Sequence, residues 1–222
     1  MPSHCRQSFS RTRREPVFSG SHTIQAPVSI VPQCPVSGAI IRMTPYLSQR
    51  DGTMLNGKRI SIVAAMARNR VIGAANDIPW KAPGEQRRFR ELTLGQLVVM
   101  GRRTYESIGR PLPERDVLVI GSRTIDAARV VTCRTLEEAI QTLGNDAREE
   151  IFIAGGEQIY RLFLPYADTL YLTEIDLEPA GDAVFPILPP GFECIERVPV
   201  SGEPAYTFLT FRRTASEKEN AN

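Results

Sequence analysis

Histidine is almost absent from this chain. Of its 222 residues only His4 and His22 are histidine, and none follows position 22. This excludes Ser-His-Asp and Cys-His catalysis, and metal binding by histidine, from all later residues. Proton transfer there must depend on carboxylates, tyrosine, lysine or water.

Cysteines and long apolar runs are also scarce. The four cysteines, Cys5, Cys34, Cys133 and Cys194, form no CxxC pair. Four scattered thiols do not support a disulfide framework, so we expect a reducing compartment, the cytoplasm. The longest apolar stretch, residues 62–67, is far shorter than the roughly 20 residues of a membrane helix. We expect neither a membrane span nor a metal centre.

Charge is unevenly distributed along the chain. Residues 1–58 contain seven basic and two acidic residues. Removing these from the totals of 27 and 25 leaves 20 basic against 23 acidic residues in 59–222. Nucleic-acid binding requires a basic surface, so no nucleic-acid partner is expected for this part of the chain.

The first 58 residues show no sustained hydrophobic period. They are rich in Ser, Pro, Gly and Arg, which predicts a largely disordered extension. Residues 3–14 are Arg- and Ser-rich and free of acids, as in a transit peptide. The favoured alternative is upstream sequence without a role, because Met43 or Met54 could start translation. We divide the chain into an extension (1–58), a single domain (59–213) and a disordered tail (214–222).

From residue 59, short β-branched runs alternate with amphipathic segments. The runs predict buried strands at 60–67, 96–101, 116–122, 129–133, 150–156 and 169–176. The amphipathic segments predict helices at 85–94, 103–109, 135–144 and 157–167. For the third helix, Thr135 is a plausible N-cap and Glu138 has the capping-box spacing.

Residues 193–200 and 205–213 alternate in polarity and are joined by SGEP, which predicts an antiparallel hairpin. Strands that alternate with helices predict an α/β fold, with a mostly parallel sheet covered on both faces.

The stretch IPWKAPGEQRRF places Glu85 at the start of the first predicted helix. Trp80, the only tryptophan, lies five residues earlier. Glu85 shares one face with Phe89 and Leu92, and the acid could simply favour the helix dipole. On that apolar face, however, burial of the acid is costly unless a cationic or hydrogen-bond-donating ligand binds it. The residues predicted to face water are Gln86, Arg87, Arg88, Arg90 and Glu91.

Two stretches have the order strand, glycine turn, helix. In VVMGRRT a strand ends at Gly101 and a helix begins with Arg102 and Arg103. Helix N-termini and arginines both bind phosphate, although two solvated surface arginines are the alternative. FIAGGEQIY repeats the order around Gly155 and Gly156. Two such turns at the ends of parallel strands predict one dinucleotide that spans both.

Several motifs together resemble dihydrofolate reductase in order and spacing. They are AAMARNRVIGAANDIPW, VVMGRRTYESIGRPLPERDVLVI, IFIAGGEQIYRLFLPYADTLYLTEID and AGDAVFP. DIPWKAPGEQ, with Glu as the acid, is similar to mobile-element, trimethoprim-insensitive bacterial enzymes. The resemblance covers about residues 59–213. It implies an eight-stranded, mostly parallel central sheet with flanking helices and an antiparallel C-terminal hairpin.

The resemblance also implies a reaction and its substrate-binding residues. The reaction is reduction of 7,8-dihydrofolate to tetrahydrofolate by NADPH, in a monomer that also binds antifolates. Glu85 would hold the pterin N3 and 2-amino group, Thr173 would hydrogen-bond the Glu85 carboxylate and the pterin, and Trp80 would position a water; these form the catalytic set. Arg115 would pair with the glutamate carboxylate of the substrate. The wall residues implied are Ala65, Ile78, Phe89, Ile108 and Leu112.

For the cofactor, Arg102 and Ser122 would bind the 2′-phosphate, and residues 73–80 would form a mobile loop over the nicotinamide. The cofactor residues implied are Ala65, Ile72, Gly73, Gly101, Arg102, Arg103, Thr104, Ser122, Arg123, Ala154, Gly155, Gly156, Gln158, Ile159 and Tyr160. Two residues depart from the family pattern. Ala154 replaces a bulkier aliphatic residue, and Glu157 stands where a small residue is usual. An acid near a pyrophosphate is unfavourable unless it points to solvent.

Two other functions compete with this one. The riboflavin-pathway reductase shares the fold, but its pyrimidine substrate would not call for the set Glu85, Trp80 and Thr173. The other rival is a non-catalytic nucleotide-binding homologue, or an interaction module built on residues 1–58. The presence of Glu85, Arg102 and Arg115 argues against loss of catalysis.

Overall fold

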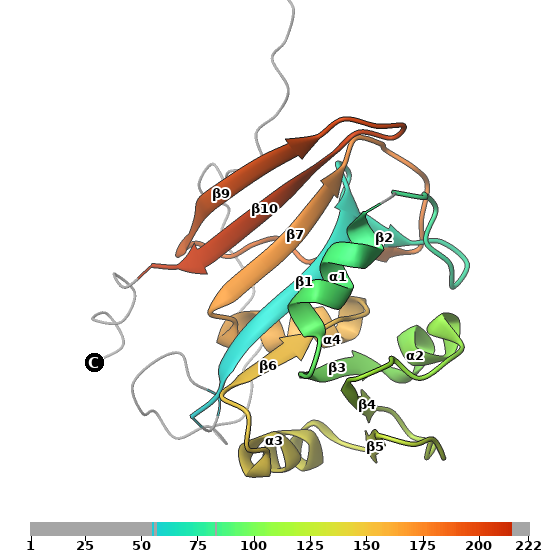
Figure 1. Ribbon diagram of the computed structural model, residues 1–222, viewed down its shortest axis with the longest axis vertical. Helices are drawn as coiled ribbons and strands as arrows, with labels where there is room; N and C mark the ends of the chain where they lie inside the picture. Colours follow the sequence, from blue (N-terminus) through green and yellow to red (C-terminus); the bar gives the residue numbers. More distant parts are fainter. Residues whose placement is uncertain (1–54, 56, 83, 215–222) are drawn as a thin grey trace, which may run out of the picture. The chain divides into compact units, whose positions relative to one another are not determined.

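The computed structural model describes residues 55, 57–82 and 84–214, which contain an eight-stranded central sheet (Figure 1). The strands are β1 (Arg59–Ala67), β3 (Leu97–Gly101), β4 (Asp116–Ile120), β5 (Val130–Cys133), β6 (Glu150–Ile153), β7 (Thr169–Ile175), β9 (Phe192–Val200) and β10 (Tyr206–Arg213). Their order is β5-β4-β3-β6-β1-β7-β10-β9. Neighbours are parallel except where β10 pairs with β7 and β9. The predicted fold class and C-terminal hairpin are confirmed.

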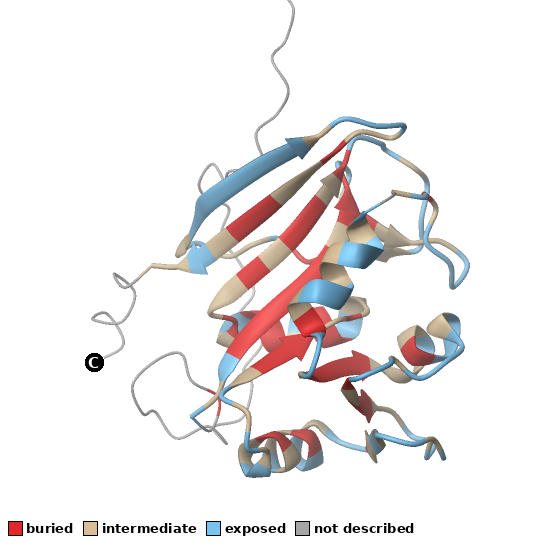
Figure 2. Ribbon diagram, in the orientation of Figure 1, coloured by how far each residue is buried: buried red, intermediate tan, exposed pale blue. Residues whose placement is uncertain are grey.

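Apolar side chains explain why the middle of this sheet is buried. Ile60, Ile62, Ile151, Leu170 and Leu172, on β1, β6 and β7, have no exposed surface. Strands of a parallel sheet are covered on both faces, so they are apolar on both. Figure 2 shows these strands as mostly buried, whereas the edge strand β9 is exposed along most of its length.

In the part of the chain that the structure describes, four α-helices connect the strands. They are α1 (Glu85–Thr93), α2 (Arg102–Ile108), α3 (Leu136–Asn145) and α4 (Glu157–Phe163), and the 3-10 helix η1 (Leu164–Tyr166) continues α4. The predicted N-cap of α3 is confirmed, because Thr135 Oγ1 accepts from Glu138 N at 3.2 Å. The Glu138 carboxylate in turn accepts from Arg134 N at 2.7 Å, one residue before the cap.

Two short strands were not predicted. β2 (Val71–Gly73) and β8 (Ala183–Val184) form a separate antiparallel sheet. Runs of three and two residues are too short to show a hydrophobic period. The predicted strand 150–156 also ends earlier, at Ile153, because Gly155 turns the chain with a φ of 101°.

The described part of the chain begins a few residues before the predicted boundary at 59. Leu55 is only 3% exposed. Lys58 Nζ donates to the carbonyl oxygens of Asp146 at 2.6 Å and Arg148 at 2.8 Å. Both residues were assigned to the extension. Leu55 is buried, and Lys58 is hydrogen-bonded to the domain. The rest of that extension, and the tail from residue 215, lie outside the described residues.

Within the described residues, no helix has the length and apolar character needed to cross a bilayer. The same part of the chain contains no group of three or more His, Cys, Asp or Glu residues placed to hold a metal ion.

Candidate active site

The two predicted glycine turns lie side by side, because β3 and β6 are adjacent and parallel. Gly101 N donates to Gly155 O at 2.7 Å. A Cβ on Gly155 would lie 2.8 Å from the Tyr160 ring, and a Cβ on Gly156 would lie 3.1 Å from Thr104 Oγ1. Glycine is therefore required at position 155, where φ is also 101°, and position 156 has little room for a side chain. The peptide between Gly155 and Gly156 is cis.

Arg102 lies at the start of α2 and is held by an acid on the next helical turn. Its Nη1 donates to both oxygens of Glu106, at 2.7 and 2.6 Å. Arg102 also packs against the end of β4, since a Cβ on Gly121 would lie 2.7 Å from Arg102 Cβ. Ser122 and Arg123 follow Gly121 directly and are exposed. The structure therefore brings the predicted 2′-phosphate residues to one place.

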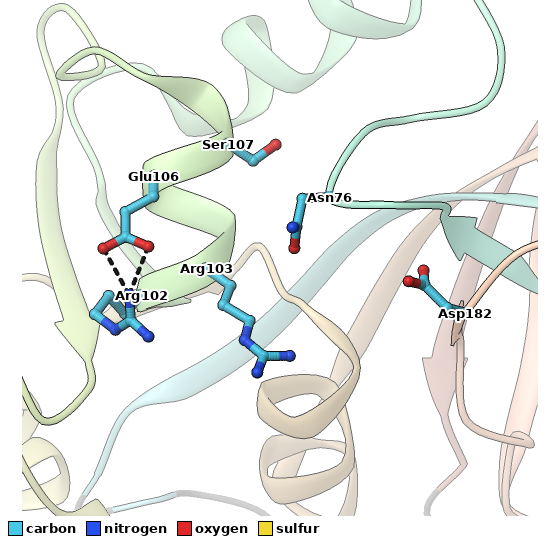
Figure 3. A pocket seen from close by; sticks show the side chains of 6 residues that line it. All are labelled: Asn76, Arg102, Arg103, Glu106, Ser107 and Asp182. Atoms are coloured by element: carbon cyan, nitrogen blue, oxygen red, sulfur yellow. Dashed lines mark hydrogen bonds and ion pairs between the residues drawn. The ribbon is translucent and has the colours of Figure 1, made fainter.

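A cavity of about 530 Å³ opens beside Arg102 and Arg103. Figure 3 shows its lining side chains, which come from α2, from the loop after β2 and from the segment before β8. These side chains are Asn76, Arg102, Arg103, Glu106, Ser107 and Asp182. Two guanidinium groups make the α2 side of the cavity suitable for an anionic ligand.

The loop after β2 is tied to the segment that precedes β8. Ala75 N donates to Asp182 Oδ2 at 3.3 Å, and Asp182 N donates to Gly73 O at 3.1 Å. Within the loop, Ala74 and Asp77 exchange backbone hydrogen bonds. Ile78, a predicted pocket residue of this loop, is 50% exposed. Sequence reasoning assigned no role to Asp182, because its partner is more than 100 residues away.

Glu85 is the first residue of α1 and is half-buried. Burial raises the pKa of its carboxyl group. The charge of Glu85 also helps to raise the pKa of Tyr160, after the larger effect of burial on that phenol. Tyr160 OH donates to Val63 O at 2.9 Å. The Tyr160 ring also lies over Gly155, so this tyrosine connects the surroundings of the acid with the second glycine turn.

Trp80, Ala65 and Thr173 also come together. Trp80 is in a core cluster with Ala67, Val71, Ile175 and Tyr206, and Ala65 packs against that cluster. Thr173 is buried and pairs in register with Ala65 of β1. The predicted catalytic and pterin-contacting residues thus lie on neighbouring elements.

A second apolar group gathers the other predicted wall residues. Phe89, Ile108 and Leu112 all pack against one buried cluster, as does Ala154. The members of that cluster are Val98, Met100, Tyr105, Val117 and Val119.

Arg115 is a buried cation beside this wall. It is 4% exposed and lies 5.7 Å from the centroid of the Phe89 ring. Its Nη1 donates to Thr93 Oγ1 at 3.1 Å and its Nε to Pro113 O at 3.0 Å. Burial lowers the pKa of this guanidinium. Arg115 forms no ion pair with another described residue.

With this geometry established, comparison with known proteins identifies the family. The family model described as dihydrofolate reductase matches residues 59–213. The chain belongs to the dihydrofolate reductase family. The family predicted from the quoted motifs is confirmed.

Bacterial dihydrofolate reductases with type designations are among its relatives. The chain is 41% identical over 157 residues to dihydrofolate reductase type A13 of Escherichia coli, covering 70% of this chain and 94% of that protein. It is 47% identical over 140 residues to dihydrofolate reductase type 3 of Salmonella typhimurium, covering 62% and 85%.

A solved structure agrees with both fold and family. The dihydrofolate reductase from Enterococcus faecalis, complexed with NADP(H) and RAB-propyl, is 30% identical and superimposes with a TM-score of 0.65. The match covers 70% of this chain and 96% of that structure.

One residue of this dihydrofolate reductase lies differently from its predicted place. Arg88 was expected to face water, but its guanidinium lies 4.2 Å from the centroid of the Phe208 ring. Its Nη2 contacts Thr210 Oγ1 at 3.4 Å, and Thr210 donates to Glu196 Oε2 at 2.8 Å. Helical spacing could not reveal this contact, because a long arginine can bury its stem and ring-facing surface while it remains charged.

Proposed function

We propose that this dihydrofolate reductase uses NADPH to reduce 7,8-dihydrofolate, with Glu85 as the residue that anchors the pterin. The observation that carries the proposal is the link between Glu85 and the cofactor turn. The Glu85 charge acts on Tyr160, whose ring lies over Gly155. An acid close to a dinucleotide-type glycine turn is the arrangement that hydride transfer to a cationic or hydrogen-bond-donating heterocycle requires.

Bound NADPH supplies the hydride, and the protein supplies position and electrostatic field. The Glu85 carboxylate accepts hydrogen bonds from the pterin N3 and 2-amino groups and favours protonation at N5. Water delivers that proton, because no histidine follows position 22. Trp80 and Thr173 hold the water and the pterin edge, while Ala65 and Ile78 line the pocket.

The residues of the cofactor side fit a phosphorylated dinucleotide. Arg102 would offer its guanidinium to a 2′-phosphate, although its Nη1 is bonded here to both carboxylate oxygens of Glu106. Arg103 and Thr104 would hold the pyrophosphate beside Gly156, which Thr104 already approaches. The other residues proposed to contact the cofactor are Ala65, Ile72, Gly73, Gly101, Ser122, Arg123, Ala154, Gly155, Gln158, Ile159 and Tyr160.

The far end of the substrate would lie on the wall formed by Phe89, Ile108 and Leu112. Arg115 would pair with the substrate's glutamate carboxylate. Thr93 and Pro113 already orient its guanidinium, so little side-chain entropy is lost on binding. We also propose a monomer, in which one chain supplies every residue of the proposed site.

Resistance to trimethoprim is part of the proposal. It is supported by DIPWKAPGEQ, with Glu85 as the acid, and by the type designations of the bacterial relatives. Methotrexate, which like the substrate has a terminal glutamate, should still bind through Arg115.

One assay tests the reaction. Loss of NADPH absorbance on addition of dihydrofolate is expected, and slower loss with NADH. The control is a riboflavin-pathway pyrimidine in place of dihydrofolate, which should give no loss. Turnover of the pyrimidine but not of dihydrofolate would replace this proposal with the riboflavin-pathway reductase.

A further inference from the structure

Glu157 is an acid at a position where the family pattern has a small residue, directly after the second glycine turn. It does not extend freely into solvent, since its side chain is only 26% exposed. Its Oε2 accepts from Val184 N at 2.9 Å. Its Oε1 accepts from Arg161 Nε at 3.1 Å and Arg161 Nη2 at 2.8 Å. The acid therefore joins α4 to a strand 27 residues away in sequence.

The strand reached by Glu157 leads to the loop after β2. Val184 pairs with Val71 in the small β2–β8 sheet. Two residues before Val184, Asp182 accepts from Ala75 N and donates through its own backbone to Gly73 O. A continuous series of contacts thus runs from the first turn of α4, through Glu157 and β8, to the loop that begins at residue 74.

The surroundings of Glu157 also explain how an acid can lie near the proposed pyrophosphate site. The Val184 N–H and Arg161 lower the pKa of its carboxyl group, so it is ionised at neutral pH. Arg161 offsets that charge in an i,i+4 pair. The carboxylate is directed to these donors, and its charge is not left uncompensated beside the cofactor turn.

We infer that Glu157 is a positioning residue that fixes β8 against α4 and, through Asp182, holds the loop after β2 in place over the nicotinamide. The inference rests on the proposed NADPH-dependent reaction. A second contact links α4 to the residue directly after β8, the Tyr160 and Phe185 rings at a centroid distance of 5.0 Å, and it is independent of Glu157. Removal of the acid should therefore loosen β8 without unfolding the domain.

Two variants separate the hydrogen bond from the charge. Glu157→Gln keeps an oxygen that can accept from Val184 N, whereas Glu157→Ala removes it. In the protein without ligands, the Val184 amide should exchange with solvent about tenfold faster in Glu157→Ala, and nearly as in wild type in Glu157→Gln. Exchange is measured residue by residue with NMR. The matched control is Glu137→Ala, which removes an exposed first-turn acid of α3 and should leave Val184 exchange unchanged.

Kinetics then test the positioning role. In Glu157→Ala, kcat should fall about tenfold; in Glu157→Gln, kcat should be retained and the KM for NADPH should fall, because a negative charge is removed. Arg161→Ala should behave like wild type in Val184 exchange. Unchanged Val184 exchange in Glu157→Ala, or equal kcat values for the Ala and Gln variants, would overturn the inference. Absence of dihydrofolate turnover in the wild-type protein would instead overturn the proposed function, and the exchange rates would still decide the contact.

Discussion

The Arg88 guanidinium stacks on the Phe208 ring, and this contact joins α1 to β10. Phe208 pairs in register with Thr173 of β7. The helix that begins with Glu85 is therefore attached to the strand beside the proposed pterin-binding threonine. We therefore expect Arg88, which the helical spacing predicted to face water, to help fix the position of Glu85.

Arg88→Ala should destabilise the protein by about 1–2 kcal/mol, because stacking and hydrogen bonding are lost together. It should also raise the KM for dihydrofolate. Arg88→Lys should recover little of the lost stability, since an ammonium group lacks the planar face that stacks on the ring. Urea unfolding with parallel kinetics measures both effects. Arg87→Ala is the control: Arg87 is 82% exposed in its pair with Glu91, so a change below about 0.5 kcal/mol is expected. Equal losses of stability in Arg88→Ala and Arg87→Ala would show that the contact of Arg88 with Phe208 does not stabilise the fold.

Glu85→Gln should reduce the rate at neutral pH by about 10²-fold or more. Part of that rate should return at low pH, where the substrate takes its proton directly from solution. Because a proton must reach N5, wild-type activity should fall as pH rises, and the raised pKa of buried Glu85 should let the site take up that proton above the ordinary range of a carboxyl group. Rate–pH profiles of both enzymes test this, and superimposable profiles would exclude Glu85 from the mechanism.

The raised pKa of Glu85 also predicts how the folding stability of Glu85→Gln depends on pH. A carboxyl with a raised folded-state pKa binds its proton more tightly in the folded than in the unfolded protein. Its favourable contribution is complete below the unfolded pKa and is lost as pH rises through the folded pKa. Glu85→Gln should therefore be more stable than wild type at neutral pH, with the advantage vanishing in acid. Thermal unfolding at several pH values provides the measurement.

Arg102→Ala should raise the KM for NADPH about tenfold or more and leave that for NADH nearly unchanged, because the 2′-phosphate is the only difference between the two. Arg103→Ala is the comparison, since loss of a pyrophosphate contact should weaken both cofactors equally. Steady-state kinetics with each cofactor distinguish the roles. Equal effects of Arg102→Ala on NADPH and NADH would place Arg102 elsewhere.

Trimethoprim should inhibit this enzyme weakly while methotrexate inhibits it strongly. Glu85 has one more methylene than Asp, so its carboxylate sits differently relative to the helix backbone. The small drug depends on that carboxylate for a charge-assisted pair, whereas methotrexate is also held at the Arg115 end. Glu85→Asp should lower the trimethoprim inhibition constant by about tenfold. Gln86 and Ile78 are expected to contribute by shaping the wall, and nanomolar inhibition of wild type would contradict resistance.

A shortened chain that begins at Met54 should match the full chain in activity and melting temperature. It retains Leu55, which is buried, and Lys58, which donates to two backbone carbonyls. A chain that begins at Arg59 would lack both residues and should melt several degrees lower. Thermal unfolding of the three proteins checks the boundary; a large loss already at Met54 would show that earlier residues pack on the domain.

Apolar runs predicted the six parallel strands of the central sheet, and alternating polarity predicted β9 and β10, although β9 is exposed along most of its length. Neither pattern was sufficient for β2 and β8, which are held by pairing with one another and by contacts such as that between Val184 N and Glu157.

Among the candidate site residues, the glycine turns were recognisable from spacing, since only glycine fits where Gly155 meets Tyr160. Asn76 and Asp182 were not, because they line the cavity only after distant loops come together. The contact of Arg88 with Phe208 could not be predicted for another reason: an arginine stacked on an aromatic ring has the same helical spacing as an arginine that faces water.

The exposed strand β9 has a consequence for self-association. Unpaired strand edges add strands from other molecules unless charge, proline or irregularity prevents it. β9 carries Glu193, Glu196 and Arg197 together with Pro199, which lacks an N–H, and its pairing with β10 shifts register near Thr210. At the opposite edge, β5 is only four residues long. We therefore expect both sheet edges to resist extension by a second copy, and strand-to-strand aggregation to be slow at high concentration.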